Sequence, residues 1–267
     1  MAGTNIQIEY RYADGNLERL PKLALELVRL KVDAIVAGGT PAVAAAKQAT
    51  STIPIVAGSA GDLVGAGLVA SLARPGGNVT GSTNVDPDLS GKRLELLKEV
   101  LPKLLRVAVL VHENPGDRDE LRETQTVARP FGVQIQSLEV KEPDQFQSVY
   151  AEMTKKGAHA VIIFNSTFTS IHRKQLMELA AKHRLPSMCG PTQYTDVGCL
   201  ISYGPDPRDH WRRATNYIDK ILKGAKPADL PVEQPKKYYL IINLKTAKTI
   251  GLTIPPNVLV RADRVIK

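Results

Sequence analysis

Short apolar runs alternate with longer stretches of helical hydrophobic spacing along most of this chain of 267 residues. The apolar runs predict buried strands, and the alternation at Ile6, Ile8 and Tyr10 predicts a strand with one buried face. Strands are expected over residues 34–37, 53–57, 79–83, 106–111, 133–140, 160–164, 186–189 and 200–203, and helices over 17–30, 42–49, about 63–72, 89–101, 117–131, 143–156 and 168–183. This alternation indicates βαβ units, which form parallel sheets.

Two such series follow one another, and the segment 74–84 separates them. Within it, Pro75, Gly76 and Gly77 form a turn signal. At least one of the two glycines is expected to have a positive φ, because glycine has no Cβ to clash in that conformation.

The last third of the chain has a different pattern: a helix over 207–222, a linker over 229–236, a strand over 239–242, a helix over 244–250 and a proline-marked return over 254–260. A helix and a strand that return this late suggest three crossings between two lobes. We therefore predict an α/β protein with two Rossmann-like lobes built on parallel sheets. Lobe one is expected to comprise 1–84 with 204–231, and lobe two 85–203 with 232–267.

Candidate ligand contacts follow from this topology, because ligands of open parallel sheets meet the loops at the carboxyl ends of the strands. These loops contain small and polar residues. The candidates are Gly39, Thr40 and Asp62 in lobe one, Asn114, Asn165, Ser166, Thr167, Tyr194 and Tyr203 in lobe two, and Glu233 in the linker.

Each candidate has a chemical role and a plainer structural alternative. The carboxylate of an amino-acid ligand could lie at a helix N-terminus near Thr40 or near residues 166–167. Asp62 or Glu233 could pair with an ammonium group, and the two tyrosines could stack on an aromatic ligand. Alternatively, Thr40 and Asp62 only cap helices, and Glu233 is a solvated linker residue.

Composition narrows the class of protein. The net charge is +8, but its 35 Lys and Arg are spread along the chain and mixed with 27 acids, which favours a solvated basic surface over nucleic-acid binding. No apolar run is long enough to span a membrane, and the first residues show no signal-peptide pattern. The spacing of Cys189 and Cys199 is no metal motif, and two free buried thiols are expected rather than a disulfide.

The familiar catalytic and cofactor motifs are absent from the sequence. Gly65-Ala-Gly67 lacks the third glycine of a dinucleotide fingerprint, and there is neither a phosphate-binding Gly-Lys-Ser/Thr loop nor a Gly-x-Ser-x-Gly elbow. The five histidines lie in different segments, without metal-ligand spacing. We therefore expect no cofactor, no metal and no enzymatic activity.

Several separated motifs resemble the ABC transporter substrate-binding protein family that includes the tryptophan- and tyrosine-binding lipoproteins. The motif Arg-Pro-Gly-Gly-Asn-Val-Thr-Gly at 74–81 resembles the signature turn of that family. The segments 92–98, 230–235, 242–248 and 251–256 resemble its following helix and its C-terminal cassette, in the same order. The likeness covers nearly the whole chain.

This resemblance implies a periplasmic-binding-protein type I fold, with a small solute such as an amino acid or aromatic acid held between two lobes. It also implies a membrane permease as partner and an extracytoplasmic location. Relative to the family, the chain begins at the second strand, so the first strand and helix of lobe one are expected to be missing, with possible self-association through the incomplete sheet. Two alternatives share the fold class: an effector-binding domain of a repressor and, less favoured, an α/β enzyme.

Overall fold

The structure, a computed structural model, describes residues 6–84, 89–112 and 115–267. The chain divides into two compact units: unit 1, Met1–Thr83 with His210–Glu233, and unit 2, Asn84–Asp209 with Gln234–Lys267. These bounds differ from the predicted lobes at both late crossings. Residue Gly204 pairs with Tyr239 inside the sheet of unit 2, whereas Glu233 pairs with Ser82 in unit 1. The strand pairing of Gly204 therefore keeps it in unit 2, and the pairing of Glu233 keeps it in unit 1.

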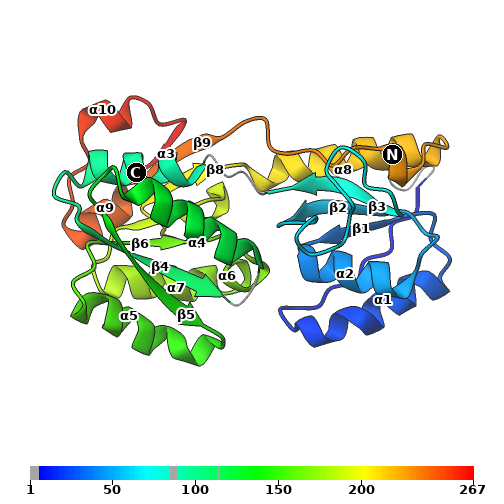
Figure 1. Cartoon of the computed structure of the whole chain (residues 1–267), viewed down its shortest axis with the longest axis horizontal. Coiled ribbons are helices and arrows are strands. Elements are labelled where there is room, and N and C mark those ends of the chain that lie inside the picture. Colours follow the sequence, from blue (N-terminus) through cyan, green and yellow to red (C-terminus); the bar gives the residue numbers. More distant parts are fainter. Residues whose placement is uncertain (1–5, 85–88, 113–114) are drawn as a thin grey trace. The chain divides into compact units, whose positions relative to one another are not determined.

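Unit 1 contains a three-stranded parallel sheet in the order β1-β2-β3. Figure 1 shows α1 and α2 on one face of this sheet and α8 on the other. The core beneath α1 and α2 includes Ile35, Val43 and Ile55, whereas Val56 packs against the α8 side chains. The elements are η1 (Leu17–Arg19), α1 (Leu20–Arg29), β1 (Ile35–Gly38), α2 (Thr40–Ala49), β2 (Ile55–Ala60), β3 (Val79–Thr83), α8 (Pro207–Leu222), which begins in unit 2, and η4 (Pro227–Asp229).

Two predicted elements of unit 1 are wrong. Residues 7–12 form no strand, and Ile6, Ile8 and Tyr10 are exposed, because no described strand lies beside them to bury the alternating face. Residues 63–67 form turns instead of a helix, since Asp62 binds the amides of Val64 and Gly65 locally. This local bonding competes with helical hydrogen bonds.

The turn before β3 has the expected backbone. Gly76 has φ 75°, which confirms that one of the two glycines takes a left-handed conformation. Its N–H donates to the carbonyl of Ala228 in η4. The turn therefore connects β3 with the late crossing of the chain.

Unit 2 contains a seven-stranded sheet in the order β10-β9-β8-β7-β6-β4-β5. Neighbouring strands are parallel, as predicted, except β8 and β9, which are antiparallel. The chain between β8 and β9 runs through unit 1 and returns in the opposite direction. The strands are β4 (Arg106–His112), β5 (Gln134–Val140), β6 (Ala160–Ile163), β7 (Ser187–Cys189), β8 (Ile201–Gly204), β9 (Tyr239–Asn243) and β10 (Arg264–Ile266).

Helices cover both faces of the unit 2 sheet. One core joins Leu97 and Ala128 to Val109 and Ile242, and the other joins Tyr150 and Leu176 to the opposite face, so unit 2 has three layers. The helices are α3 (Leu89–Val100), α4 (Pro115–Ala128), η2 (Pro143–Gln145), α5 (Phe146–Lys155), α6 (Thr167–Ile171), α7 (Arg173–Lys182), η3 (Thr192–Val197), α9 (Leu244–Ile250) and α10 (Pro256–Leu259).

Cys189 and Cys199 are joined by a disulfide, which corrects the expectation of two free thiols. Both residues are fully buried, at the end of β7 and just before β8. The bond closes the loop that contains η3. No local pattern in the sequence indicates this pairing, because the two cysteines come together only when β7 and β8 are neighbours in the sheet.

Candidate functional site

The exits of β1 and β2 meet at Thr40 in unit 1. Gly39, with φ 86°, occupies the N-cap position of α2, and Thr40 is the first helical residue, so the predicted capping position is one residue off. The Thr40 hydroxyl instead accepts a hydrogen bond from the N–H of Gly61, at 3.0 Å. Thr40 therefore links two strand exits, and Gly39 supplies the backbone turn between β1 and α2.

Asp62 organises the loop after β2. Its Oδ1 accepts hydrogen bonds from the N–H groups of Val64 and Gly65, at 3.0 and 2.9 Å. The residue thus caps a turn, and its Oδ2 accepts no hydrogen bond within the described residues. Asp62 is half-buried and directly follows Gly61, whose N–H donates to Thr40.

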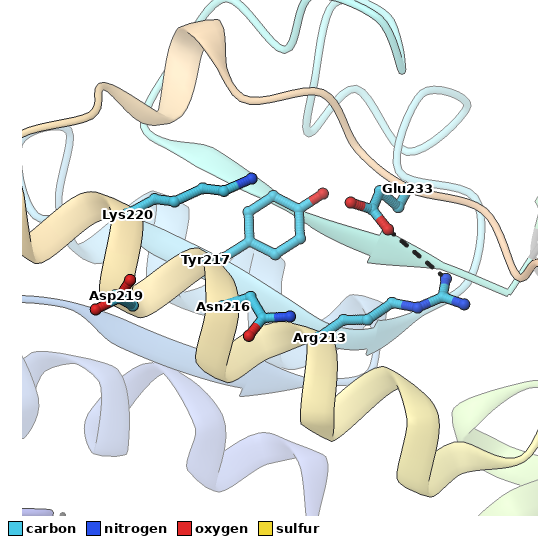
Figure 2. A pocket seen from close by; sticks show the side chains of 6 residues that line it. All are labelled: Arg213, Asn216, Tyr217, Asp219, Lys220 and Glu233. Carbon is cyan, nitrogen blue, oxygen red and sulfur yellow. Dashed lines mark ion pairs between the residues drawn. The ribbon is translucent and has the colours of Figure 1, made fainter.

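Glu233 is held beside β3 and is not a free linker residue. Its N–H donates to Gly81 O at 2.9 Å, and its carbonyl accepts from Thr83 N–H at 3.0 Å. Figure 2 shows its carboxylate directed toward Arg213 of α8, where Nη1 and Oε2 are 3.9 Å apart. The two residues line a pocket of about 280 Å³ with Asn216, Tyr217, Asp219 and Lys220.

The pocket beside Glu233 is lined by polar and charged side chains, and all but Glu233 come from α8. Tyr217 donates its hydroxyl hydrogen to Pro231 O at 2.6 Å, and burial raises the pKa of this phenol. Lys220 Nζ lies 5.9 Å from the Tyr217 ring centre. Glu233 therefore lines this pocket together with side chains of α8.

Sequence reasoning missed two side chains of α8 near the strand exits of unit 1. The Trp211 ring lies against Gly38 and Gly58, where a Cβ on Gly58 would come within 2.5 Å of it. His210 is buried, and its Nδ1 lies 3.0 Å from Ser82 Oγ. The available signal was a single tryptophan in the chain together with glycines at the ends of two predicted strands.

In unit 2, the exit of β4 is braced by Asp117, which is buried in the first turn of α4. Its Oδ2 accepts a hydrogen bond from the N–H of His112 at 2.8 Å. The His112 ring stacks on Phe168, with ring centres 4.2 Å apart, and His172 packs edge-on against the same phenyl ring. Burial lowers the pKa of His172, which favours its neutral form. The predicted contact Asn114 lies outside the described residues.

The exit of β6 contains three predicted contacts. Ser166 is the N-cap of α6, in a reciprocal capping box with Thr169, and Thr167 is the first residue of that helix. Asn165 Oδ1 accepts a hydrogen bond from the Ser170 hydroxyl at 3.1 Å. Since α6 has only five residues and its terminus is already capped, it offers a weaker anion site than the predicted long helix over 168–183.

The two predicted tyrosines differ from the expected stacking residues. Tyr194 is fully buried, and its hydroxyl donates to Thr169 Oγ1 at 3.1 Å, so its ring supports the β6 exit and presents no face to solvent. Burial raises the pKa of this phenol. Tyr203 is half-buried at the end of β8, where its ring lies 6.2 Å from Tyr238. Tyr203 is therefore the more accessible of the two.

An ion pair between the buried Arg93 and the partly buried Glu120, also missed from the sequence, lies where β7 and β8 end. Arg93 of α3 donates from Nη1 to Glu120 Oε1 of α4 at 2.6 Å and from Nε to Tyr203 O at 3.0 Å. Burial raises the pKa of Glu120 to about 7, although the charge of Arg93 opposes this shift. A protonated carboxyl can still accept from Arg93 through its carbonyl oxygen.

Taken by unit, eight of the ten predicted residues form three groups: Gly39, Thr40 and Asp62; Asn165, Ser166 and Thr167 with Tyr194 behind them; and Glu233 in its own pocket. Among the described residues, no cluster of His, Cys, Asp and Glu could hold a metal ion. The same part of the chain contains no helix long and apolar enough to cross a membrane. The strand exits thus present hydroxyl, amide and carboxylate groups suited to hydrogen-bonding a small polar solute.

Comparison with known proteins agrees with these features. The family described as ABC transporter substrate binding protein matches residues 2–266. A tyrosine-binding protein of Clostridioides difficile (strain R20291) is 25% identical over 252 residues, covering 94% of this chain and 72% of the relative.

Two solved structures match nearly the whole chain. The ABC domain in complex with L-Trp from Streptococcus pneumonia has a TM-score of 0.89 and 27% identity, covering 98% of this chain and 90% of that one. A conserved domain protein from Vibrio cholerae has a TM-score of 0.90 and 29% identity, covering 99% and 88%. Because the family model matches residues 2–266, the chain belongs to the ABC transporter substrate-binding protein family, and these structural matches show the periplasmic-binding-protein type I fold.

Proposed function

We propose that the protein is the solute-binding component of an ABC uptake transporter and binds an amino acid or aromatic acid. The supporting observation is the set of polar groups at the carboxyl ends of the strands in each unit, notably Thr40 in unit 1 and Asn165 in unit 2. The names of two relatives, one tyrosine-binding and one bound to L-Trp, support this solute class.

The partner and location follow from the same proposal. A solute-binding component delivers its ligand to a membrane permease, and family members act outside the cytoplasm. We therefore propose an ABC permease as the partner and an extracytoplasmic site of action.

Thermal unfolding with a panel of solutes tests the function. The panel is L-tryptophan, L-tyrosine, L-phenylalanine and benzoate, with D-glucose as the unrelated solute. At least one acid should raise Tm without being consumed, because ligand at 100 times Kd adds about 2.7 kcal/mol to the stability of the folded state. No shift with any acid, or turnover of one, would contradict the proposal.

The double variant Thr40→Ala/Asn165→Ala should lose this ligand-induced shift. Because both side chains also make internal hydrogen bonds, the unliganded protein should be less stable by about 1–3 kcal/mol. The matched control is Asn78→Ala/Thr249→Ala, which removes internal hydrogen bonds away from the strand exits. The control should keep the ligand shift despite its lower Tm. Equal shifts in both double variants would show that Thr40 and Asn165 do not contact the solute.

We also propose self-association through the edge of β1. Ile35 and Gly39 donate their N–H groups to Pro54 O and Ser59 O, so the backbone groups of Val36 and Gly38, on alternate positions, face away from β2. No described strand pairs with that side. Val36 is 43% exposed, and β1 has neither a charge nor a proline to block edge-to-edge pairing.

Sedimentation equilibrium distinguishes this interface from other surfaces. The wild type should form dimers in the micromolar range, and Val36→Lys should weaken dimerisation at least about ten-fold by placing a charge at the edge. Val260→Lys is the matched control, since Val260 is 86% exposed in unit 2. A monomeric wild type, or equal dimerisation of Val36→Lys and wild type, would disprove the interface.

A further inference from the structure

Arg93 is a buried cation with one donor group left over. Its residue surface is only 7% exposed. Nε and Nη1 are occupied by Tyr203 O and Glu120 Oε1, whereas Nη2 makes no hydrogen bond to the described residues. The guanidinium therefore keeps donor capacity that the protein itself does not use.

The absence of a side chain at Gly190 leaves space for Arg93 Nη2. A Cβ on Gly190 would lie 2.7 Å from Arg93 Nη2, and its three nearest heavy atoms all belong to the Arg93 guanidinium. Gly190 directly follows β7, and Tyr203 lies in β8, so Nη2 lies where these strands end. This is the edge of a parallel sheet at which ligands bind.

We propose that Arg93 Nη2 binds the carboxylate of the solute, in a subsite formed by Arg93, Gly190 and Glu120. This inference rests on the proposed function and specifies one anchor within it. Two hydrogen bonds hold the guanidinium in place before the solute arrives, which reduces the entropy cost of binding. An arginine–carboxylate hydrogen bond is charge-assisted and stronger than a neutral one.

The subsite couples binding to protonation of Glu120. The charged groups that act on Glu120 are Arg93 from α3 and Asp117 and Glu123 from its own helix, and burial raises its pKa to about 7. A solute carboxylate beside Arg93 adds negative charge near Glu120, which favours the protonated form further. Binding should therefore take up a proton, and affinity should fall as pH rises through about 7.

Calorimetric titration with L-tryptophan and L-tryptophanamide, which lacks the carboxylate, tests the subsite. The wild type should bind the acid at least about ten-fold more tightly than the amide, the energy of one charge-assisted hydrogen bond. Gly190→Ala and Arg93→Lys should both lose this preference, the first by displacing Nη2 and the second by removing the guanidinium fork. Gly91→Ala, on the same helix as Arg93, is the control because its Cβ would meet only Val127, at 3.8 Å.

The pH profile supplies a readout that a purely structural ion pair would not change. Between pH 6 and pH 8, wild-type affinity for the acid should fall several-fold, whereas Glu120→Gln should show a flat profile. Circular dichroism checks that each variant is folded. If Arg93→Lys is unstable, Gly190→Ala still tests the subsite, because this variant retains both Arg93 and Glu120.

The outcomes separate the subsite from the wider function. Equal binding of L-tryptophan by wild type, Gly190→Ala and Arg93→Lys would overturn the subsite and leave the proposed function intact. Equal affinity of the wild type for L-tryptophan and L-tryptophanamide would also overturn the subsite and leave the proposed function intact. A wild type that binds only solutes without a carboxylate would also exclude the subsite. If no solute of the panel binds, both proposals fail.

Discussion

Gly81→Ala is expected to destabilise unit 1 by more than about 4 kcal/mol, because the new methyl group has no space. Gly81 lies in β3 with φ 125°, and a Cβ there would lie 2.3 Å from Ala57 O and 2.5 Å from Ala57 N. Both atoms belong to the backbone of the neighbouring strand, in register with Gly81. No side chain can move to relieve the clash, so β2 and β3 would have to separate.

Urea unfolding of purified variants measures this effect. The control is Gly67→Ala, because Gly67 also has a positive φ of 67° but no atom lies within 4 Å of the added Cβ. Gly67→Ala should cost only the backbone strain of about 1–2 kcal/mol. If Gly81→Ala is no less stable than this control, the close approach of β2 and β3 at Ala57 is wrong.

The second large effect is expected from the disulfide in unit 2. Opening the bond between Cys189 and Cys199 releases a loop with a sequence separation of 10, and loop-closure entropy for that length corresponds to about 3 kcal/mol. Unfolding with and without dithiothreitol should show this loss in the wild type. Cys189→Ala/Cys199→Ala should start from a lower stability and be insensitive to the reductant.

A thiol assay under denaturing, non-reducing conditions checks the premise. The wild type should show no reactive thiol, because both cysteines of the chain are in the bond. Two reactive thiols in protein prepared under oxidising conditions would contradict the disulfide and restore the expectation of free cysteines.

Elements with terminal signals were predictable from sequence. The helix 207–222 agrees with α8 at both ends because Pro207 begins it and Lys223-Gly224 follows it. The helix 244–250 likewise ends at Gly251, which has φ 75°. The family resemblance gave the fold, and family membership places the protein among solute-binding proteins and not enzymes.

Features that depend on distant partners were not predictable. The alternation at 6–10 describes a strand only when another strand lies beside it. Arg93 and Glu120 are 27 residues apart on separate helices, so neither spacing nor charge pattern revealed their contact. Tyr194 was a candidate for stacking on an aromatic ligand, but it is fully buried and its hydroxyl donates to Thr169. Which loops follow which strands can be inferred from sequence, whereas the partner of each side chain cannot.

The position of Trp211 makes one half of the molecule optically distinct. It is the only tryptophan in the chain, it belongs to unit 1, and its indole rests on Gly38 and Gly58. Emission excited at 295 nm, roughly where tryptophan alone absorbs, therefore reports on the sheet of unit 1. The disulfide belongs to unit 2, so the exposure of its sulfur atoms to a reductant reports on that unit. The two halves can thus be followed separately during unfolding without attaching a dye, which shows directly whether they melt as one cooperative system or in sequence.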